Sequence, residues 1–349
     1  MENMKRKNSA KANIVIVVSV TILSMLLILF SGSGMGLALG SFVRGIFGSK
    51  YAIAEVFVKA IPLTLTALGI GVGFKTGFTN LGAEGQIYMG AMAATYFALK
   101  FPNLPKAIMI PLLVIVGFVS GGLWALISGL LKAKYKVSEI IIGIMLNYIG
   151  IGLVGVALQT FLQDPNNAFP MSEILGDNAT LGLLLPSTRL HAGLIIMILA
   201  VIAIYIYVWR TPQGFEMRAC GESKRASQCA GISVYKNVII SALISGGLAG
   251  IAGMIEVAGL HHQLIEGISP NYGYTAIMIS LLGANHPIGI LLSAIGISAL
   301  QVGSLSMQRS AGVPNAISTI ILGITILFVI AKPYIRSRLM KKGGQNESK

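Results

Sequence analysis

Long apolar runs, separated by short polar or basic segments, are the dominant pattern along this chain. A helix needs ~20 apolar residues to cross a hydrocarbon core of ~30 Å, and several runs approach that length. Lipid offers the backbone no hydrogen-bond partner, so each run predicts a helix. The expected spans are residues 14–30, 51–74, 84–101, 107–131, 138–162, 191–209, 237–258, 274–283, 287–305 and 316–331.

The sequence therefore predicts an all-α polytopic membrane protein with about ten transmembrane segments, some of them short or broken. The run at 274–283 is too short to span alone, and Pro287 follows it, which disfavours helix in the residue before. Residues 34–50 read as an external segment with a short surface helix. The span at 138–162 has Ser138 as its expected N-cap.

Basic residues concentrate in alternate connecting segments, which assigns sides to the predicted spans. Lys and Arg are enriched in cytoplasmic loops of membrane proteins. By this rule the tail 1–13, the loop 210–236 and the basic tail 332–349 are cytoplasmic, so both termini lie inside. The acidic loop 163–190 lies outside. The transmembrane domain then covers residues 14–331.

Composition supports the assignment to a membrane and also bears on how the positive net charge is interpreted. The chain is 54% hydrophobic and 11% charged, whereas soluble domains carry about 25% charged residues. The net charge of +14 is explained by the basic cytoplasmic segments, so no nucleic-acid partner is expected. Cys220 and Cys229 fall in the loop 210–236, where a reducing compartment predicts free thiols.

A polar, glycine-rich break at residues 73–90 interrupts the early apolar runs. It carries Asn80, Glu84 and Gln86. It does not fit a phosphate-binding P-loop, because Phe74 separates Gly73 from Lys75 and no βα unit precedes it. The sequence shows no metal-ligand cluster and no nucleophile-and-base set. We expect no cofactor in this chain and no enzymatic activity, with an intramembrane enzyme as a distant alternative.

Six polar residues are candidates for the wall of a translocation pathway. Asn147 lies nine residues into its span, ~14 Å deep at ~1.5 Å per residue, where a polar side chain faces either protein or a water-filled path. A hydrogen bond between helices and a contact with substrate explain it equally well. Glu84 begins a helix, where a carboxylate also stabilises the positive dipole end. The full set is Asn80, Glu84, Gln86, Asn147, Asn285 and His286; for the last two, capping of a turn is the alternative we favour.

The two halves of the chain contain a similar order of apolar and polar segments. Residues 68–90 and 245–278 each contain a glycine-rich helix, a polar break and a second apolar run. Transporters are often built from inverted repeats with discontinuous helices, and substrate binds where the repeats meet. We treat an inverted repeat as a hypothesis.

Residues 214–232 predict a small helix on the cytoplasmic surface. Ser223 can cap it, Ala226 and Ala230 share one face, and Gly231 can end it. From the residues alone, a basic loop that only anchors the topology is the more economical interpretation.

This segment resembles the cytoplasmic coupling segment of permease subunits of ABC importers, in the family serving ribose-type sugars, branched-chain amino acids and nucleosides. The resemblance covers nearly the whole chain. It implies that the segment docks in a groove of a separate ATPase subunit, which holds ATP and Mg²⁺. It also implies a second permease chain, identical or not, an extracytoplasmic substrate-binding protein, and a place in the cytoplasmic membrane. The matching positions are Gly214, Arg218, Ala219, Gly221, Ala226, Gly231 and Ile232.

Two further motifs, 80–86 (Asn-Leu-Gly-Ala-Glu-Gly-Gln) and 145–148 (Met-Leu-Asn-Tyr), resemble the nucleoside branch of that family more than its sugar or amino-acid branches. The expected function is thus nucleoside import. One alternative is import of a simple sugar such as ribose or galactose. Another is ion-coupled secondary transport, which usually places ionisable residues in mid-membrane; here they gather at helix ends.

Overall fold

The computed structural model describes residues 34–314, 316–317, 319–320, 323–324 and 327. The predicted span at 14–30 and the tails 1–13 and 332–349 lie outside the described residues, as does much of the span at 316–331. Within the described part the chain forms helices and no β-strand, apart from two isolated bridges. The all-α fold class is confirmed there.

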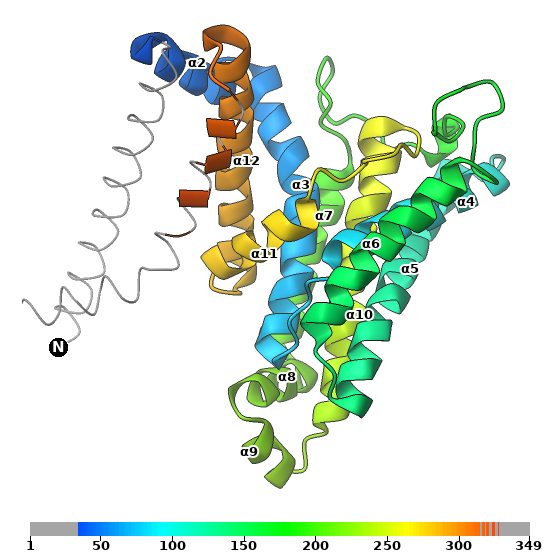
Figure 1. Cartoon of the computed structure of the whole chain (residues 1–349), viewed down its shortest axis with the longest axis vertical. Coiled ribbons are helices and arrows are strands. Elements are labelled where there is room, and N and C mark those ends of the chain that lie inside the picture. The colour runs from blue at the N-terminus through cyan, green and yellow to red at the C-terminus, as the bar shows by residue number, and fades with distance from the viewer. Residues whose placement is uncertain (1–33, 315, 318, 321–322, 325–326, 328–349) are drawn as a thin grey trace, which may run out of the picture. The chain divides into compact units, whose positions relative to one another are not determined.

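The helices follow one another with short connections, except for one long segment between α6 and α7 (Figure 1). They are α2 (Met35–Phe47), α3 (Lys50–Thr76), α4 (Ala83–Lys100), α5 (Lys106–Tyr135), α6 (Glu139–Leu158), the 3₁₀ turn η1 (Asp177–Ala179), α7 (Gly193–Arg210), α8 (Pro212–Glu222), α9 (Lys224–Cys229), α10 (Val234–Ile255), the π-helical turn η2 (Glu256–His261), α11 (Tyr272–Leu282) and α12 (Pro287–Ala311).

Six of the described helices are long and apolar enough to cross a membrane: α3, α5, α6, α7, α10 with η2, and α12. The helices α2 and α11 are apolar but shorter. This is the pattern of a multi-pass membrane protein. The total of ten crossings and the sides of the termini stay predictions. Helix α2 falls in the segment expected to carry a short helix.

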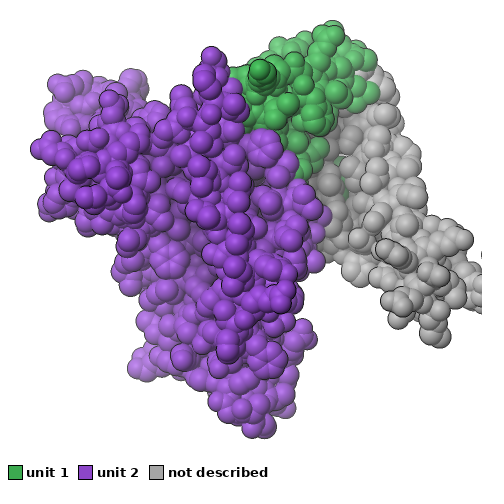
Figure 2. All heavy atoms as spheres, turned by 180° about the vertical axis from the view of Figure 1, so that it is seen from behind, with its two compact units in different colours: residues 1–56, 296–349 green, residues 57–295 purple. Residues whose placement is uncertain are grey.

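The chain divides into two compact units, coloured green and purple in Figure 2. In the first, residues 1–56 with 296–349, α2 packs against the last part of α12. A Cβ on Gly45 would lie 2.3 Å from the Ser306 Cβ, and one on Gly303 would lie 2.6 Å from the Phe42 ring. The second unit, residues 57–295, contains every candidate site residue.

Helix α10 is the centre of the second unit and packs mainly against α5 and α4. Glycines make this close approach possible, as the spacing of Gly246 and Gly250 indicates. A Cβ on Gly250 would lie 2.0 Å from the carbonyl oxygen of Gly117 and 3.0 Å from the Gly121 Cα. A Cβ on Gly246 would lie 2.3 Å from the Gly121 carbonyl oxygen. These helices touch through their backbones.

Helices α5 and α6 are joined by a tight basic turn. Lys136 ends α5 in the left-handed region, with φ of 56°. Ser138 occupies the N-cap position of α6, as expected, but its hydroxyl makes no capping hydrogen bond. Glu139, in the first turn, pairs instead with Lys132 of α5. The turn is therefore closed by an ion pair between the two helices.

The segment between α6 and α7 has little regular structure, as expected for the loop 163–190. Residues of this segment are hydrogen-bonded to the end of the α10–η2 helix and to the residues that follow it. Ser172 exchanges two hydrogen bonds of 2.9 Å with the backbone of Leu264, and the Leu181 N–H donates to the Ala258 carbonyl at 2.7 Å. The loop is thus anchored to this helix end, and its extracytoplasmic location stays a prediction.

Candidate functional site

The polar break between α3 and α4 lies along one face of α6. That face presents Glu139, Gly143, Asn147 and Gly150, at spacings of three and four residues. The Thr79 N–H donates to Glu139 Oε1 at 3.3 Å, and the N–H of Gly85 donates to Asn147 Oδ1 at 2.8 Å.

Gly143 and Gly150 provide the room for this contact. A Cβ on Gly143 would lie 2.8 Å from the Gly82 nitrogen, and one on Gly150 would lie 3.2 Å from the Gly85 Cα. From Glu139 to Asn147 the face rises ~12 Å along the helix axis. The break therefore starts level with the α5–α6 turn, and α4 begins inside the helical layer.

Asn80 and Gln86 form a reciprocal amide pair inside the break. Asn80 Nδ2 donates to Gln86 Oε1 at 2.8 Å, and Gln86 Nε2 donates to Asn80 Oδ1 at 3.0 Å. Asn80 also donates to Ser245 Oγ of α10 at 2.8 Å and accepts from the Gly82 N–H at 3.0 Å. Both side chains are buried. The pair replaces the helical hydrogen bonds that the break gives up and ties it to α10.

Asn147 joins three parts of the chain that are far apart in sequence. Its Oδ1 accepts from Gly85, while its Nδ2 donates to the Leu81 carbonyl at 2.8 Å and to the Tyr274 hydroxyl at 3.1 Å. The residue is fully buried. The amide thus bridges α6, the start of α4 and helix α11. This geometry favours the interhelical hydrogen bond over substrate contact in this conformation.

The carboxylate of Glu84 lies where α4 and α11 both begin. Its Oε2 accepts from the N–H of Gly273, in the first turn of α11, at 2.6 Å. A Cβ on Gly273 would lie 2.4 Å from the Glu84 nitrogen, so the two helix starts are in contact. Two positive helix ends converge on one buried acid. The polar breaks within residues 68–90 and 245–278 therefore meet at this point. That the two segments are related as an inverted repeat stays a hypothesis.

Asn285 and His286 lie in the turn between α11 and α12. Ala284 and Asn285 both adopt the left-handed region, with φ of 54° and 55°. Asn285 Oδ1 accepts from Ser280 Oγ at 3.0 Å, and the Asn285 N–H donates to the Ser280 carbonyl at 2.9 Å. The His286 N–H donates to Gly283 at 3.0 Å. These bonds hold the turn, as the capping interpretation expected.

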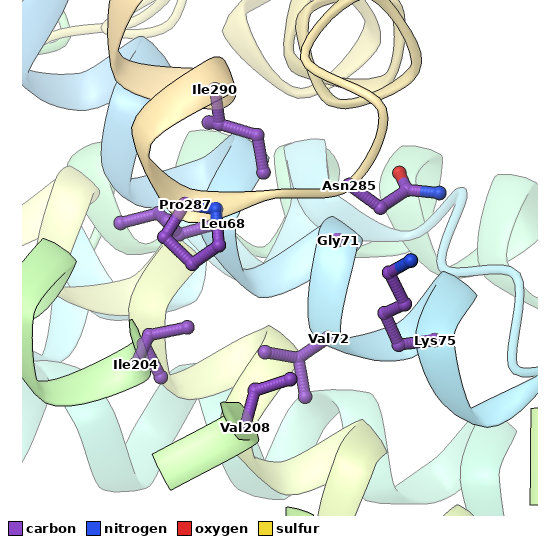
Figure 3. A pocket seen from close by; sticks show the side chains of 9 residues that line it. All are labelled: Leu68, Gly71, Val72, Lys75, Ile204, Val208, Asn285, Pro287 and Ile290. Carbon is purple, nitrogen blue, oxygen red and sulfur yellow. The ribbon is translucent and has the colours of Figure 1, made fainter. Parts of the chain in front are cut away.

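A pocket opens between this turn, α3 and α7 (Figure 3). The side chains of Lys75 and Asn285 lie on one side of it, and apolar side chains lie on the other. The pocket is lined by Leu68, Gly71, Val72, Lys75, Ile204, Val208, Asn285, Pro287 and Ile290. Asn285 and His286 are therefore grouped with α3 and α7, and not with the Asn80–Gln86 pair.

The segment expected to form one surface helix forms two, α8 and α9, beyond the ends of the long helices (Figure 1). Helix α8 was not expected from the sequence. Thr211 caps it by accepting from the Gly214 N–H at 3.1 Å, and Pro212 occupies its first turn. Thr-Pro before a short run is a helix-start signal that the sequence does contain.

Helix α8 is seated directly on the backbone of α3 and α7. A Cβ on Gly214 would lie 2.2 Å from the Tyr207 carbonyl oxygen, and one on Gly221 would lie 2.2 Å from the Lys75 carbonyl oxygen. The Arg218 Nε donates to the Gly214 carbonyl at 3.4 Å. Any side chain at Gly214 or Gly221 would push α8 away from these helix ends.

Helix α9 follows the predicted design. Ser223 Oγ accepts from the Ala226 N–H at 3.3 Å, and the N–H of Ser223 donates to the Ala219 carbonyl at 3.0 Å. Gly231, with φ of 80°, follows the helix end. The Ile232 N–H donates to Ser227 at 2.9 Å and closes the last turn. These are the Ser223 cap and Gly231 stop expected from the sequence.

One cluster at the junction of these elements was not found from the sequence. Three groups surround the ring of Trp209. The Arg218 guanidinium lies 4.6 Å from the ring centroid, the Lys75 Nζ lies 5.7 Å from it, and the centroid of the His286 ring lies 5.5 Å from it. An aromatic residue at the end of an apolar span normally indicates the membrane interface. Nothing in the sequence marks it as a contact with three other elements.

The described residues contain no group of three or more His, Cys, Asp or Glu side chains placed to hold a metal ion. The polar groups of the site are instead amides, hydroxyls and backbone groups bonded to each other. Such an arrangement positions the helices relative to one another. It provides no activated nucleophile with a paired base among the residues discussed.

Comparison with known proteins gives consistent matches along most of the chain. Residues 52–330 match the family model described as "Branched-chain amino acid transport system / permease component". A guanosine ABC transporter permease protein of Bacillus subtilis is 36% identical over 306 residues, which cover 86% of this chain and 87% of the relative. A nucleoside ABC transporter permease protein of Lactococcus lactis is 35% identical, covering 84% and 83%.

A glucose ABC transporter permease protein of Haloferax volcanii is similar to a comparable extent, at 34% identity, covering 82% of this chain and 78% of the relative. No solved structure shows significant similarity to the chain.

Proposed function

Because the chain belongs to the permease-component family of branched-chain amino acid transport systems, we propose that it is the transmembrane permease subunit of an ABC importer that carries nucleosides across the cytoplasmic membrane. The observation that carries the proposal is the similarity to guanosine and nucleoside permeases over more than four fifths of the chain. The motifs at 80–86 and 145–148, which pointed to the nucleoside branch, lie within the matched family region.

In this proposal the chain provides part of the translocation path, and separate partner proteins provide ATP hydrolysis, substrate delivery and the second half of the transmembrane domain. A cytoplasmic ATPase subunit binds ATP and Mg²⁺, and this chain holds no cofactor. An extracytoplasmic binding protein delivers the substrate, and a second permease chain completes the transporter. The loop 163–190 faces the binding protein, while α8 and α9 face the ATPase.

The contacts of α8 with α3 and α7 support a role for α8 in coupling the ATPase subunit to the transmembrane helices. Helix α8 contacts the Lys75 and Tyr207 carbonyls at the ends of α3 and α7. Closure of the ATPases would displace α8, and the displacement would reach both long helices directly. The residues proposed to dock or position this segment are those of the resemblance: Gly214, Arg218, Ala219, Gly221, Ala226, Gly231 and Ile232.

The polar residues of the breaks then have a supporting role in the pathway. Asn80, Gln86, Asn147 and Glu84 hold the starts of α4 and α11 in place through the hydrogen bonds described above. Asn285 alone among the candidates lines the pocket. We propose that substrate passes along the pocket side of α3 and that the amide pair maintains the shape of the path.

A sugar substrate is the second candidate, because the similarity to the glucose permease nearly equals that to the nucleoside permeases. Uptake into cells that express the complete transporter separates the two. Unlabelled nucleosides should compete with radiolabelled guanosine uptake, whereas ribose and glucose should not. Competition by a sugar alone, or sugar uptake that nucleosides do not affect, would reject the nucleoside assignment and leave the importer assignment standing.

A further inference from the structure

The Trp209 cluster connects the coupling segment to the pocket. The ring belongs to α7, and it touches Arg218 of α8, Lys75 of α3 and His286 of the α11–α12 turn. Two of these contacts adjoin the pocket, because Lys75 lines it and His286 follows the lining residue Asn285. A single side chain therefore lies between the proposed ATPase-facing helix and the pocket.

The Trp209 ring is in contact with its neighbours through its faces and edges. The indole Nε1 is buried and has no hydrogen-bond partner, so the ring is held by its faces and not by its nitrogen. His286 packs on Trp209 and also on Tyr205, at 5.9 Å between ring centroids. The adjacent Ala284 and Asn285 adopt the left-handed region, which L-residues rarely occupy and which persists only where neighbours enforce it.

Helix α8 is packed closely on the end of α3. A Cβ on Gly221 would lie 2.2 Å from the Lys75 carbonyl oxygen, so a shift of α8 toward α3 would press on the residues around Lys75. Arg218 is three residues earlier on α8 and stacks on Trp209. A shift of α8 therefore reaches the ring from two sides, through Arg218 and through Lys75.

We propose that Trp209 is the positioning residue that transmits the movement of α8 to the Asn285–His286 turn and so opens and closes the pocket. This inference rests on the proposed function. It assigns to Trp209 neither contact with substrate nor contact with the ATPase. Its role is to make the state of the pocket depend on the position of the coupling segment.

The test measures substrate transported per ATP hydrolysed, in proteoliposomes that contain the complete transporter. Trp209→Ala should leave ATP hydrolysis near the wild-type rate and lower the transport-to-hydrolysis ratio about tenfold, the size expected when a coupling contact is lost. Trp209→Phe keeps an aromatic ring for Arg218, Lys75 and His286, so its transport-to-hydrolysis ratio should stay close to that of the wild type.

Trp124 is the matched control, because it is the other tryptophan of the chain and its indole Nε1 donates to the Leu146 carbonyl of α6 at 3.3 Å. Trp124→Ala should lower thermal stability while changing the ratio by less than about twofold. If Trp209→Ala does not assemble, Trp209→Leu, which retains more apolar volume, replaces it in the same assay.

The outcomes separate this inference from the proposed function. A wild-type ratio in Trp209→Ala, or an equal loss in Trp124→Ala and Trp209→Ala, overturns the role of Trp209. Absence of ATP-dependent uptake by the wild-type transporter overturns the proposed function itself.

Discussion

Asn147 offers the sharpest test of what the polar break does. Replacing it with leucine keeps a side chain of similar size and removes all three hydrogen bonds of the amide. The Gly85 N–H, the Leu81 carbonyl and the Tyr274 hydroxyl would lose their partner in a fully buried site.

The expected cost follows from these three bonds. Interhelical hydrogen bonds in membranes average about 0.6 kcal/mol, which gives a loss of about 2 kcal/mol for Asn147→Leu. A buried backbone group left without a partner costs about 1–3 kcal/mol, which raises the loss to about 5 kcal/mol. Either figure should lower the melting temperature of the purified protein by about 5 °C or more.

The adjacent residue supplies the control. Tyr148 is 71% exposed, so Tyr148→Leu should change the stability by less than about 0.5 kcal/mol. Tyr274→Phe removes one bond of the three, and its cost should largely disappear in the Asn147→Leu background, because both changes break the same contact. Thermal unfolding in detergent or nanodiscs measures the wild type, the three single variants and the double variant.

One result would refute this reasoning. If Asn147→Leu melts within about 1 °C of the wild type but loses uptake, Asn147 contacts substrate and the bonds described above contribute little. Loss of uptake in proportion to loss of folded protein supports the structural role.

Three further predictions concern packing, the helix starts and the coupling segment. Gly250→Ala should destabilise the protein by about 1–3 kcal/mol, because its Cβ meets a carbonyl oxygen at 2.0 Å, whereas Gly152→Ala, which meets no atom within 4 Å, should be neutral in the same melting assay. Glu84→Leu should be less stable than Glu84→Gln, since the amide oxygen can still accept the α11 hydrogen bond; equal melting temperatures would contradict this. Burial raises the pKa of the Cys220 thiol, which lowers its thiolate fraction near neutral pH, so maleimide should modify the exposed Cys229 and spare Cys220; the ATPase subunit should protect Cys229, and mass spectrometry of the labelled peptides measures both.

Local signals predicted the parts of the structure that depend on neighbours in sequence. The apolar runs gave α3, α5, α6, α7, α10 and α12 close to their observed bounds. The Ser223 cap and the Gly231 stop of α9 were readable for the same reason. Thr211 and Pro212 are also a local helix-start signal, but a single helix for residues 214–232 does not use it and so leaves out α8.

Long-range contacts could not be predicted from the sequence. The partners of Asn147 lie 62, 66 and 127 residues away, and no periodicity points to them. The depth of an amide in a span indicates that it needs a partner, and it does not identify which helix supplies that partner. The same holds for Trp209, whose four-element contact depends on how α7, α8, α3 and the α11–α12 turn pack together.

The π-helical turn η2 is a further case. It continues α10 through Glu256 to His261, where the sequence indicated an ordinary helix end. A π-helical turn depends on local packing that hydrophobic periodicity does not encode.

The decisive measurement is the initial uptake of a radiolabelled nucleoside into proteoliposomes that contain this chain, its permease partner, the ATPase subunit and the binding protein. We expect uptake that requires ATP and the ATPase subunit and that stops with orthovanadate. Uptake that persists without the ATPase subunit, driven by an ion gradient alone, would contradict it and indicate a secondary transporter.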